Sequence, residues 1–346
     1  MALTVLSDLI PYEQYFRTGY IEGVNHMIDL FNGGSNGTIL LEGENTTGTK
    51  KNTAFFKDFG TISRRDITVD SAQTSHKIER AEHTAFKTFW KFEPVEWMWT
   101  AFKTSDGMSN EEVVMMIARK LAEKKTLYNI NQAISIAAAA IESNGTSTVL
   151  DLASASKSLT VDKLVNAQAK FGDQASNLSC LVMHSAVYFA MVKNQMVNYQ
   201  FDTGAGIVLY GGTPATMNKP VVVTDAPELV YLADDNVTPL YKTLFLSPGA
   251  VTIRDNGETK VGLQDKLGFE NMKTLLQAEG DMWNYVKGYQ LKSTANPASN
   301  PAMSVLADPA NWEQWVNSVK LTAGVVIKSA ADIDAEATPI NVKIVS

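Results

Sequence analysis

The segment from Ser109 to Ser143 constrains the fold most, because its pattern predicts one long helix without an internal Gly or Pro. Apolar residues recur at spacings of three and four, with one step of six, and follow a single face; they are Val114, Ile117, Leu121, Leu127, Ile130, Ile134, Ala138 and Ile141. The run Glu123-Lys124-Lys125 interrupts the stripe, which excludes a sustained coiled-coil heptad. At about 1.5 Å per residue the helix spans roughly 50 Å, so we expect an extended surface beneath it.

An extended hairpin is predicted before the helix. Apolar and polar residues alternate with period two in Asp66–Asp70 and in Ala85–Phe92, as in strands with one buried face. Residues 50–103 carry ten basic and seven acidic side chains, a local charge of +3 in a chain of net charge -7. Because an isolated hairpin is marginally stable, we expect this basic hairpin to lie on a neighbouring copy.

Helices and strands alternate after residue 160. Helices are predicted over 161–171 and 185–196, and strands over 181–183, 207–210, 221–224, 229–233, 241–246, 250–254, 283–291 and 316–328. This order predicts a mixed α/β core. The chain of 346 residues exceeds the usual range for a single core, so more than one subdomain is expected.

The composition excludes several classes of protein. A net charge of -7 argues against a protein that binds nucleic acid by neutralising phosphates. Cys180 is the single cysteine, which excludes an intramolecular disulfide framework and fits a reducing compartment. No secretory signal is recognisable at the N-terminus, and no window approaches the roughly 20 apolar residues of a membrane span.

The chemical motifs are weak. The segment Gly43–Lys51 has the glycine spacing of a phosphate-binding loop, but Thr49 stands where the lysine belongs, which favours a plain loop. The histidines His26, His76, His83 and His184 lack the close pairing of a zinc site. Ser185 follows His184 without the glycines of a nucleophile elbow. We therefore predict no catalytic residue, no metal and no cofactor.

Three segments resemble the major capsid proteins of tailed phages. Leu164–Val192 is similar to that family's helix, Gly-Asp turn, buried strand and helix, and Gly211–Pro227 to its short strand ending in an aspartate and a proline. Asn300–Ala307, Asn311–Glu313 and Lys320–Lys328 resemble the C-terminal segment of one phage coat-protein branch. The resemblance implies an α+β chain with the Hong Kong 97-type capsid fold.

The family's subdomains imply a division of this chain. The implied parts are an N-terminal arm (1–37), an extended β-hairpin loop (38–102), the spine helix with the first part of a peripheral domain (103–159), an axial α/β domain (160–280), and peripheral return strands with the C-terminal tail (281–346). In such proteins the loop of one subunit covers the spine helix of its neighbour. Here this implies an interface between Lys57, Arg64, Arg65, Lys77 and Arg80 on the loop and Glu111, Glu112, Arg119 and Glu123 on the helix.

The resemblance also implies a function. Copies self-assemble as hexamers and pentamers into an icosahedral shell that encloses double-stranded DNA, with no catalysis. The implied partners are further copies, a portal, scaffolding or decoration proteins and the enclosed DNA, without a membrane. The protein is expected in the virion after assembly in the host cytoplasm.

Two alternatives stay open. An encapsulin-like nanocompartment has the same fold and encloses cargo enzymes instead of a genome. The genes next to the coding sequence would distinguish this function from that of a phage capsid. A soluble hydrolase would use His184 and Ser185 together with an acid that the sequence does not identify.

Overall fold

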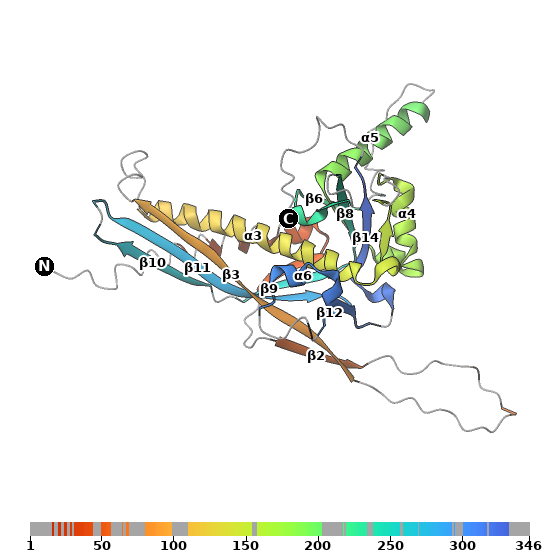
Figure 1. Cartoon of the computed structure of the whole chain (residues 1–346), viewed down its shortest axis with the longest axis horizontal. Helices are drawn as coiled ribbons and strands as arrows, with labels where there is room; N and C mark the ends of the chain where they lie inside the picture. The colour runs from red at the N-terminus through yellow and green to blue at the C-terminus, as the bar shows by residue number, and fades with distance from the viewer. Residues whose placement is uncertain are drawn as a thin grey trace.

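The computed structural model describes most of the chain from residue 80 onward and parts of the chain before it. The described residues are 16, 20–21, 24–25, 28–29, 31–43, 50–56, 64, 67–68, 80–98, 110–153, 158–202, 217, 219–233, 238–256, 259–268, 270–292, 294, 300–316 and 318–331. They form an elongated molecule in which a long helix lies along one sheet and ends beside a second sheet (Figure 1).

The long helix α3 (Asn110–Glu142) confirms the predicted helix within one residue at each end. Its apolar side lies on an eight-stranded sheet, and from Gln132 to Ile141 every residue is buried. The helix contacts elements of both sheets. The alanine-rich sequence of its second half suits close packing on all sides, because small side chains let neighbouring backbones approach.

The eight-stranded sheet is built around one long strand, β11 (Lys273–Val286). Its other strands are β1 (Ile39–Gly43), β2 (Lys50–Phe56), β3 (Arg80–Met98), β9 (Val251–Asp255), β10 (Lys260–Lys266), β12 (Tyr289–Leu291) and β13 (Trp312–Gln314). β11 pairs antiparallel with β3, β9, β10 and β12, and β1 pairs parallel with β9. The register of β3 on β11 shifts between Leu276 and Ala278, where Glu93 and Pro94 face one residue. Proline lacks the N–H that a ladder needs, so a bulge is expected there.

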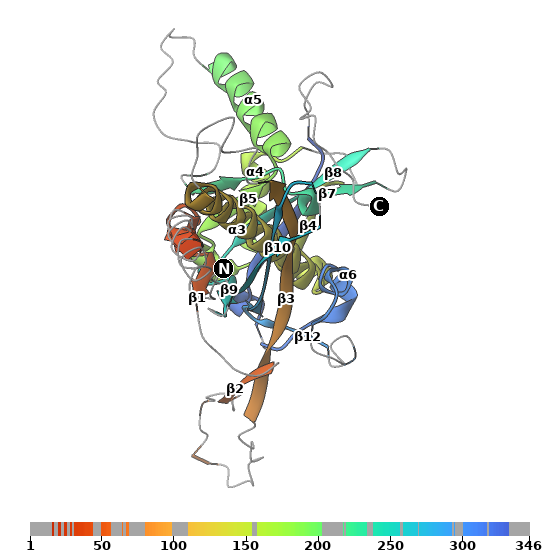
Figure 2. The ribbon, with the colours of Figure 1, turned by 90° about the vertical axis from the view of Figure 1, so that its left-hand side faces the viewer.

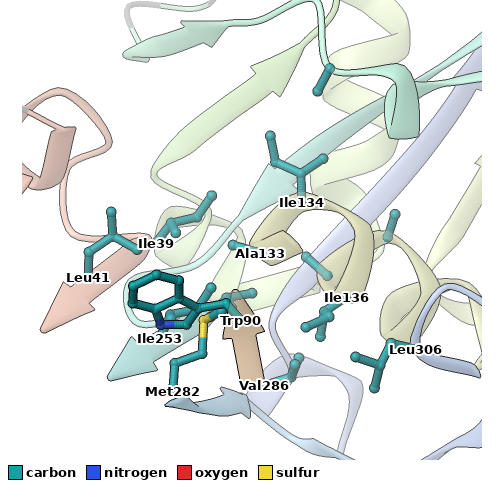
Figure 3. Close-up of a cluster of buried hydrophobic side chains, with 14 of the residues drawn as sticks. Ile39, Leu41, Trp90, Ala133, Ile134, Ile136, Ile253, Met282, Val286 and Leu306 are labelled. Carbon is teal, nitrogen blue, oxygen red and sulfur yellow. The ribbon is translucent and has the colours of Figure 1, made fainter. Parts of the chain in front are cut away.

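The core between α3 and this sheet combines apolar packing with a polar network. Figure 3 shows Ile134 and Ile136 of α3 with Trp90 and Met282 from the strands. The Trp90 ring lies against Gly280, where an added Cβ would come within 2.8 Å of the ring. In the same interface, Gln132 Nε2 donates to Thr88 Oγ1 (3.1 Å) and to Asn284 Oδ1 (3.0 Å), and Asn284 Nδ2 donates to Thr88 Oγ1 (2.8 Å). The hydrogen bonds that join Gln132 to Thr88 and Asn284 fix the register of the helix on the sheet.

The six-stranded sheet is the centre of an α/β unit that shares one of its faces with the core around α3. Its strands run in the order β4 (Val149–Asp151), β14 (Gly324–Ser329), β8 (Pro239–Leu246), β5 (Cys180–Met183) and β6 (Val221–Val223), and β7 (Val230–Leu232) also pairs with β8. The helices α4 (Val161–Ala169) and α5 (Ser185–Asp202) pack on it through a second buried cluster. Figure 2 shows α5 and the β2–β3 hairpin projecting at opposite ends of the molecule.

The strand predictions after residue 200 are right in part. Trp283–Leu291 was expected as one strand, but Gly288, with φ of 80°, turns the chain between β11 and β12. Val316–Lys328 was also expected as one strand, but a 3₁₀ turn at Val319–Leu321 precedes β14. β10 was missed. The expected strand at 207–210 lies outside the described residues, and the described residues 67–68 of the expected 66–70 strand form a bend.

The domain boundary predicted at residue 280 falls inside β11. Strands β9 and β10, on the N-terminal side of that boundary, pair in the eight-stranded sheet, whereas β14, far beyond it, pairs in the six-stranded sheet. The boundary was wrong because strand pairing joins segments that are distant in sequence. The short α6 (Met303–Leu306) packs near the C-terminal half of α3 and contributes Leu306 to the core.

Candidate assembly surfaces

The first half of α3 presents an open face. Residues on this face are exposed at helical spacing: Glu112, Met116, Arg119, Lys120, Glu123, Lys124, Leu127 and Tyr128. Three of them are large and apolar, with exposed fractions of 43% for Met116, 55% for Leu127 and 46% for Tyr128. We name these eight residues the spine face. Its mixture of apolar and charged groups is typical of a surface that a partner covers.

The structure brings part of the predicted interface together. Glu112, Arg119 and Glu123 lie on the spine face, where Lys120 Nζ donates to Glu123 Oε2 at 2.8 Å. Arg64 is exposed. The side chains of Arg80 and Glu111, in β3 and α3, lie outside the described residues, as do Lys57, Arg65 and Lys77. The interface itself therefore stays a prediction.

The prediction placed Leu127 on the buried stripe, and this was wrong because Lys125 is buried instead. Lys125 and Asn129 are both buried, so the buried positions follow Leu121 at regular helical intervals of four. The ammonium of Lys125 pairs with the Asp255 carboxylate and lies 4.3 Å from the centroid of the Trp90 ring. Burial lowers the pKa of Lys125 to about 7. A buried lysine with these partners joins α3 to β9 and β3.

The β2–β3 hairpin is the second candidate surface. Residues Lys50–Phe56 pair with Arg80–Phe86, and the inner part of β3 pairs with β11. One continuous strand therefore carries the hairpin out of the sheet (Figure 1). The segment between β2 and β3 holds most of the loop residues predicted at the interface.

The third candidate surface is the opposite end of the eight-stranded sheet. Met98, Leu267 and Met272 are exposed there by 39%, 74% and 60%. Behind them, Glu96 accepts hydrogen bonds from Lys266 (2.9 Å) and Lys273 (2.6 Å), and these two lysines lower the pKa of Glu96 to about 2. Exposed apolar side chains next to a row of charged side chains are typical of a contact surface.

The residues of the hydrolase alternative lie together but in the wrong arrangement. Asp225, which sequence reasoning missed, lies beside the pair: Ser185 Oγ donates to Asp225 Oδ1, and His184 Nε2 lies 3.6 Å from the same oxygen. His184 Nδ1 accepts the Ala186 N–H at 3.1 Å. The serine proton is thus directed to the carboxylate and not to the imidazole, which would have to act as the base in a triad. The cluster serves as the start of α5.

The other weak motifs also lack a functional arrangement. Lys50 and Lys51 lie in β2, so no helix N-terminus follows the glycine loop as a phosphate site requires. His26 and His76, and the side chain of His83, lie outside the described residues. Within the described ranges, no group of three or more metal-ligating side chains could hold an ion. No helix in that part of the chain has the length and apolarity to cross a bilayer.

A His184→Asn variant tests the role of His184 at the start of α5. Burial lowers the pKa of His184, although Asp225 opposes the shift. The ordinary pKa of histidine is about 6.5. As the pH falls below this value, His184 binds a proton in the unfolded state but stays neutral in the folded state, so the wild type loses stability. Asparagine keeps an acceptor for the helix start without titrating. We expect the melting temperature of the variant to rise relative to wild type between pH 6.5 and 5. A constant difference from pH 8 to 5 would contradict this role.

Comparison with known proteins assigns the family. Residues 8–326 match the Gp13-like family, described as major capsid protein 13-like. The major capsid protein of Bacillus phage SPP1 is 25% identical over 162 residues, 47% of this chain and 48% of that protein, so the match spans about half of that relative.

A solved structure shows the same fold. The cyanophage Pam1 capsid chain superposes with a TM-score of 0.50 at 9% identity, over 84% of this chain and 87% of that chain. The predicted α+β fold of the Hong Kong 97 type is confirmed, and the encapsulin and hydrolase alternatives are not favoured. Because the family match covers most of the chain, the chain belongs to the Gp13-like family of major capsid proteins.

Proposed function

We propose that this chain is the shell subunit of a phage capsid. Copies assemble as hexamers and pentamers into an icosahedral shell around double-stranded DNA, and the protein has no enzymatic activity. The virion is its location after assembly in the host cytoplasm. A portal and scaffolding or decoration proteins are its further partners.

One observation supports this proposal most directly: the molecule pairs a projecting hairpin with an uncovered helix face. The hairpin is held away from the core by β3, and the spine face leaves Met116, Leu127 and Tyr128 open. A hairpin of one copy that lies on the spine face of the next would bury these side chains. The same contact repeated around a ring closes a symmetric assembly, as heterologous interfaces do when their rotation closes.

The predicted subdomains take their roles from this arrangement. The hairpin loop of 38–102 and the spine helix make the contacts between neighbours. The α/β unit built on the six-stranded sheet lies toward the five- and sixfold axes. The arm of 1–37 contributes Phe16 and Tyr20, whose buried rings stack with centroids 6.0 Å apart.

Electron microscopy of the purified protein tests the function. We expect uniform closed shells from the wild type. We expect Leu127→Asp to remain as small oligomers, because it places a charge on the spine face without reaching the core. Its melting temperature before assembly should match that of the wild type. A wild-type protein that stays a compact monomer at high concentration would refute the proposed function.

A further inference from the structure

A buried carboxylate lies where α3 meets the six-stranded sheet. Glu142 is the last residue of α3, and its side chain is 8% exposed. Its Oε1 lies 2.8 Å from Lys242 Nζ and its Oε2 lies 3.3 Å from Lys328 Nζ, so the carboxylate forms an ion pair with each lysine. Lys242 in β8 and Lys328 in β14 are direct cross-strand partners. The carboxylate therefore bridges two neighbouring strands from the end of the helix.

An aromatic ring completes the cluster. The ammonium groups of Lys242 and Lys328 each lie 5.5 Å from the centroid of the Tyr231 ring in β7. Burial raises the pKa of Tyr231, and the carboxylates of Asp151 and Glu142 raise it further. Glu142 and the two lysines thus lie close together beside one ring. We name Glu142, Lys242, Lys328 and Tyr231 the joint cluster.

This arrangement costs free energy that ordinary helix packing avoids. The C-terminal end of a helix carries partial negative charge, which disfavours a glutamate there. Burial of a carboxylate adds a desolvation penalty that ion pairs seldom exceed, so an apolar cluster would stabilise the fold equally well. The buried carboxylate is stabilised only while both ammonium groups stay within a few ångströms of it, because a buried charge without its partners is costly. The joint cluster is thus better suited to fix an orientation than to add stability.

The joint cluster lies where the two parts meet, next to the apolar core that they share. Gln132 and Lys125 hold α3 to the eight-stranded sheet. One face of the α/β unit has its own core under α4 and α5, and its other face joins the core that contains the buried side of α3. At the end of α3 the chain is held to both: Thr148 Oγ1 donates to the Ile141 carbonyl at 2.6 Å, and Asn144 Nδ2 donates to Tyr289 Oη at 3.2 Å. We expect a change at this end to alter the angle between the two parts.

We propose that the carboxylate of Glu142, held by Lys242 and Lys328, fixes the angle between α3 and the six-stranded sheet and so selects the size of the shell. This inference rests on the proposed function, because only an assembling subunit converts an internal angle into curvature. Two subunit angles that differ by a few degrees close shells of different diameter. Glu142 is a positioning residue in this role.

Glu142→Gln tests the inference, since it keeps the shape of the side chain and removes its charge. We expect shells of several diameters in electron micrographs where the wild type gives one. Lys320→Met is the matched control, because Lys320 pairs with Asp173 at an exposed site within the α/β unit, away from α3. It should give the wild-type diameter. Shells of one wild-type diameter from Glu142→Gln would overturn the inference.

A second variant separates orientation from stability. The triple variant Glu142→Leu, Lys242→Met, Lys328→Met makes the cluster apolar, so we expect its melting temperature to match or exceed that of the wild type. Its shells should still vary in diameter. A triple variant that forms shells of the single wild-type size would assign the cluster to stability alone. This variant also carries the test if Glu142→Gln fails to fold.

A measurement without assembly distinguishes failure of this inference from failure of the proposed function. Spin labels on cysteines at Met116→Cys and Phe189→Cys, both exposed, report the distance between α3 and α5 in the unassembled protein. We expect a narrow distance distribution in the labelled parent and a broad one after Glu142→Gln. Equal widths would refute the joint cluster's role even if shells form. A wild type that forms no shells would refute the proposed function. The distance distributions would then still test whether the joint cluster fixes the angle between α3 and the six-stranded sheet.

Discussion

Replacement of residues 57–79 by an Asn-Gly turn should give a protein that folds but forms no shells. Phe56 and Arg80 are direct partners in the β2–β3 ladder, so a two-residue turn can close the hairpin there. The core would keep all of its described contacts. The deletion removes four of the predicted interface residues, namely Lys57, Arg64, Arg65 and Lys77. Size-exclusion chromatography and electron microscopy measure assembly, and the melting temperature of the unassembled protein measures folding.

A Gly/Ser segment of equal length in place of 57–79 separates the reach of the loop from its side chains. If side-chain contacts drive assembly, this variant also stays unassembled. If it forms shells, the loop acts as a spacer and the charged residues carry no specificity. Normal shells from the Asn-Gly variant would remove the loop from the assembly mechanism.

At pH 6, below the Lys125 pKa of about 7, Lys125→Met should reduce the free energy of unfolding by about 3–5 kcal/mol, as expected when one partner of a buried ion pair is removed. The side chain of Lys125 is 2% exposed, and its loss leaves the Asp255 carboxylate, 18% exposed, without its counter-charge. Addition of Asp255→Leu should restore most of the lost stability, because both charges are then absent. Urea denaturation of the unassembled protein measures each value.

The neighbouring residue supplies the control for this cycle. Lys124 is exposed on the spine face, so Lys124→Met should change the stability by less than about 0.5 kcal/mol. If Lys125→Met is no less stable than Lys124→Met, the buried pair does not hold α3 to β9. The two lysines are adjacent in sequence and receive the same substitution, so a difference in stability between the variants reflects the burial of Lys125.

Helical periodicity predicted α3 almost to the residue, but it misjudged which side is covered near its middle. The reason is that Lys125 and Asn129 are polar residues at buried positions, and a pattern of apolar residues alone cannot reveal them. The partners of Lys125 are Asp255 and Trp90, which come from β9 and β3. A buried charge can be recognised only when the segment that neutralises it is known, and that information is not local.

Strand pairing was the other limit. Alternation identified the sequence around Phe86–Phe92 as a strand, and the structure confirms it within β3. Alternation says which side chains share a face but not which strand lies alongside, so the pairing of β3 with β11 and of β14 with β8 could not be derived. For the same reason, the spine face and the joint cluster were visible only after the fold was known.

Gly324 shows a related limit at a single position. A Cβ added there would lie 2.1 Å from the Phe245 carbonyl oxygen, so the close approach of β14 to β8 requires glycine. In the sequence this residue stands within an apolar run that resembles any other strand. The requirement arises from a backbone that is distant in the chain.

The continuity of β3 has a mechanical consequence. A neighbour that pulls on the hairpin transmits its force along the strand from Arg80 to Met98, without an intervening loop. The hydrogen bonds between antiparallel strands run perpendicular to that direction, so those joining β3 to β11 are loaded together in shear and do not open one by one. A shell that swells under internal pressure would therefore yield at the contacts between subunits before β3 is drawn out of its own sheet.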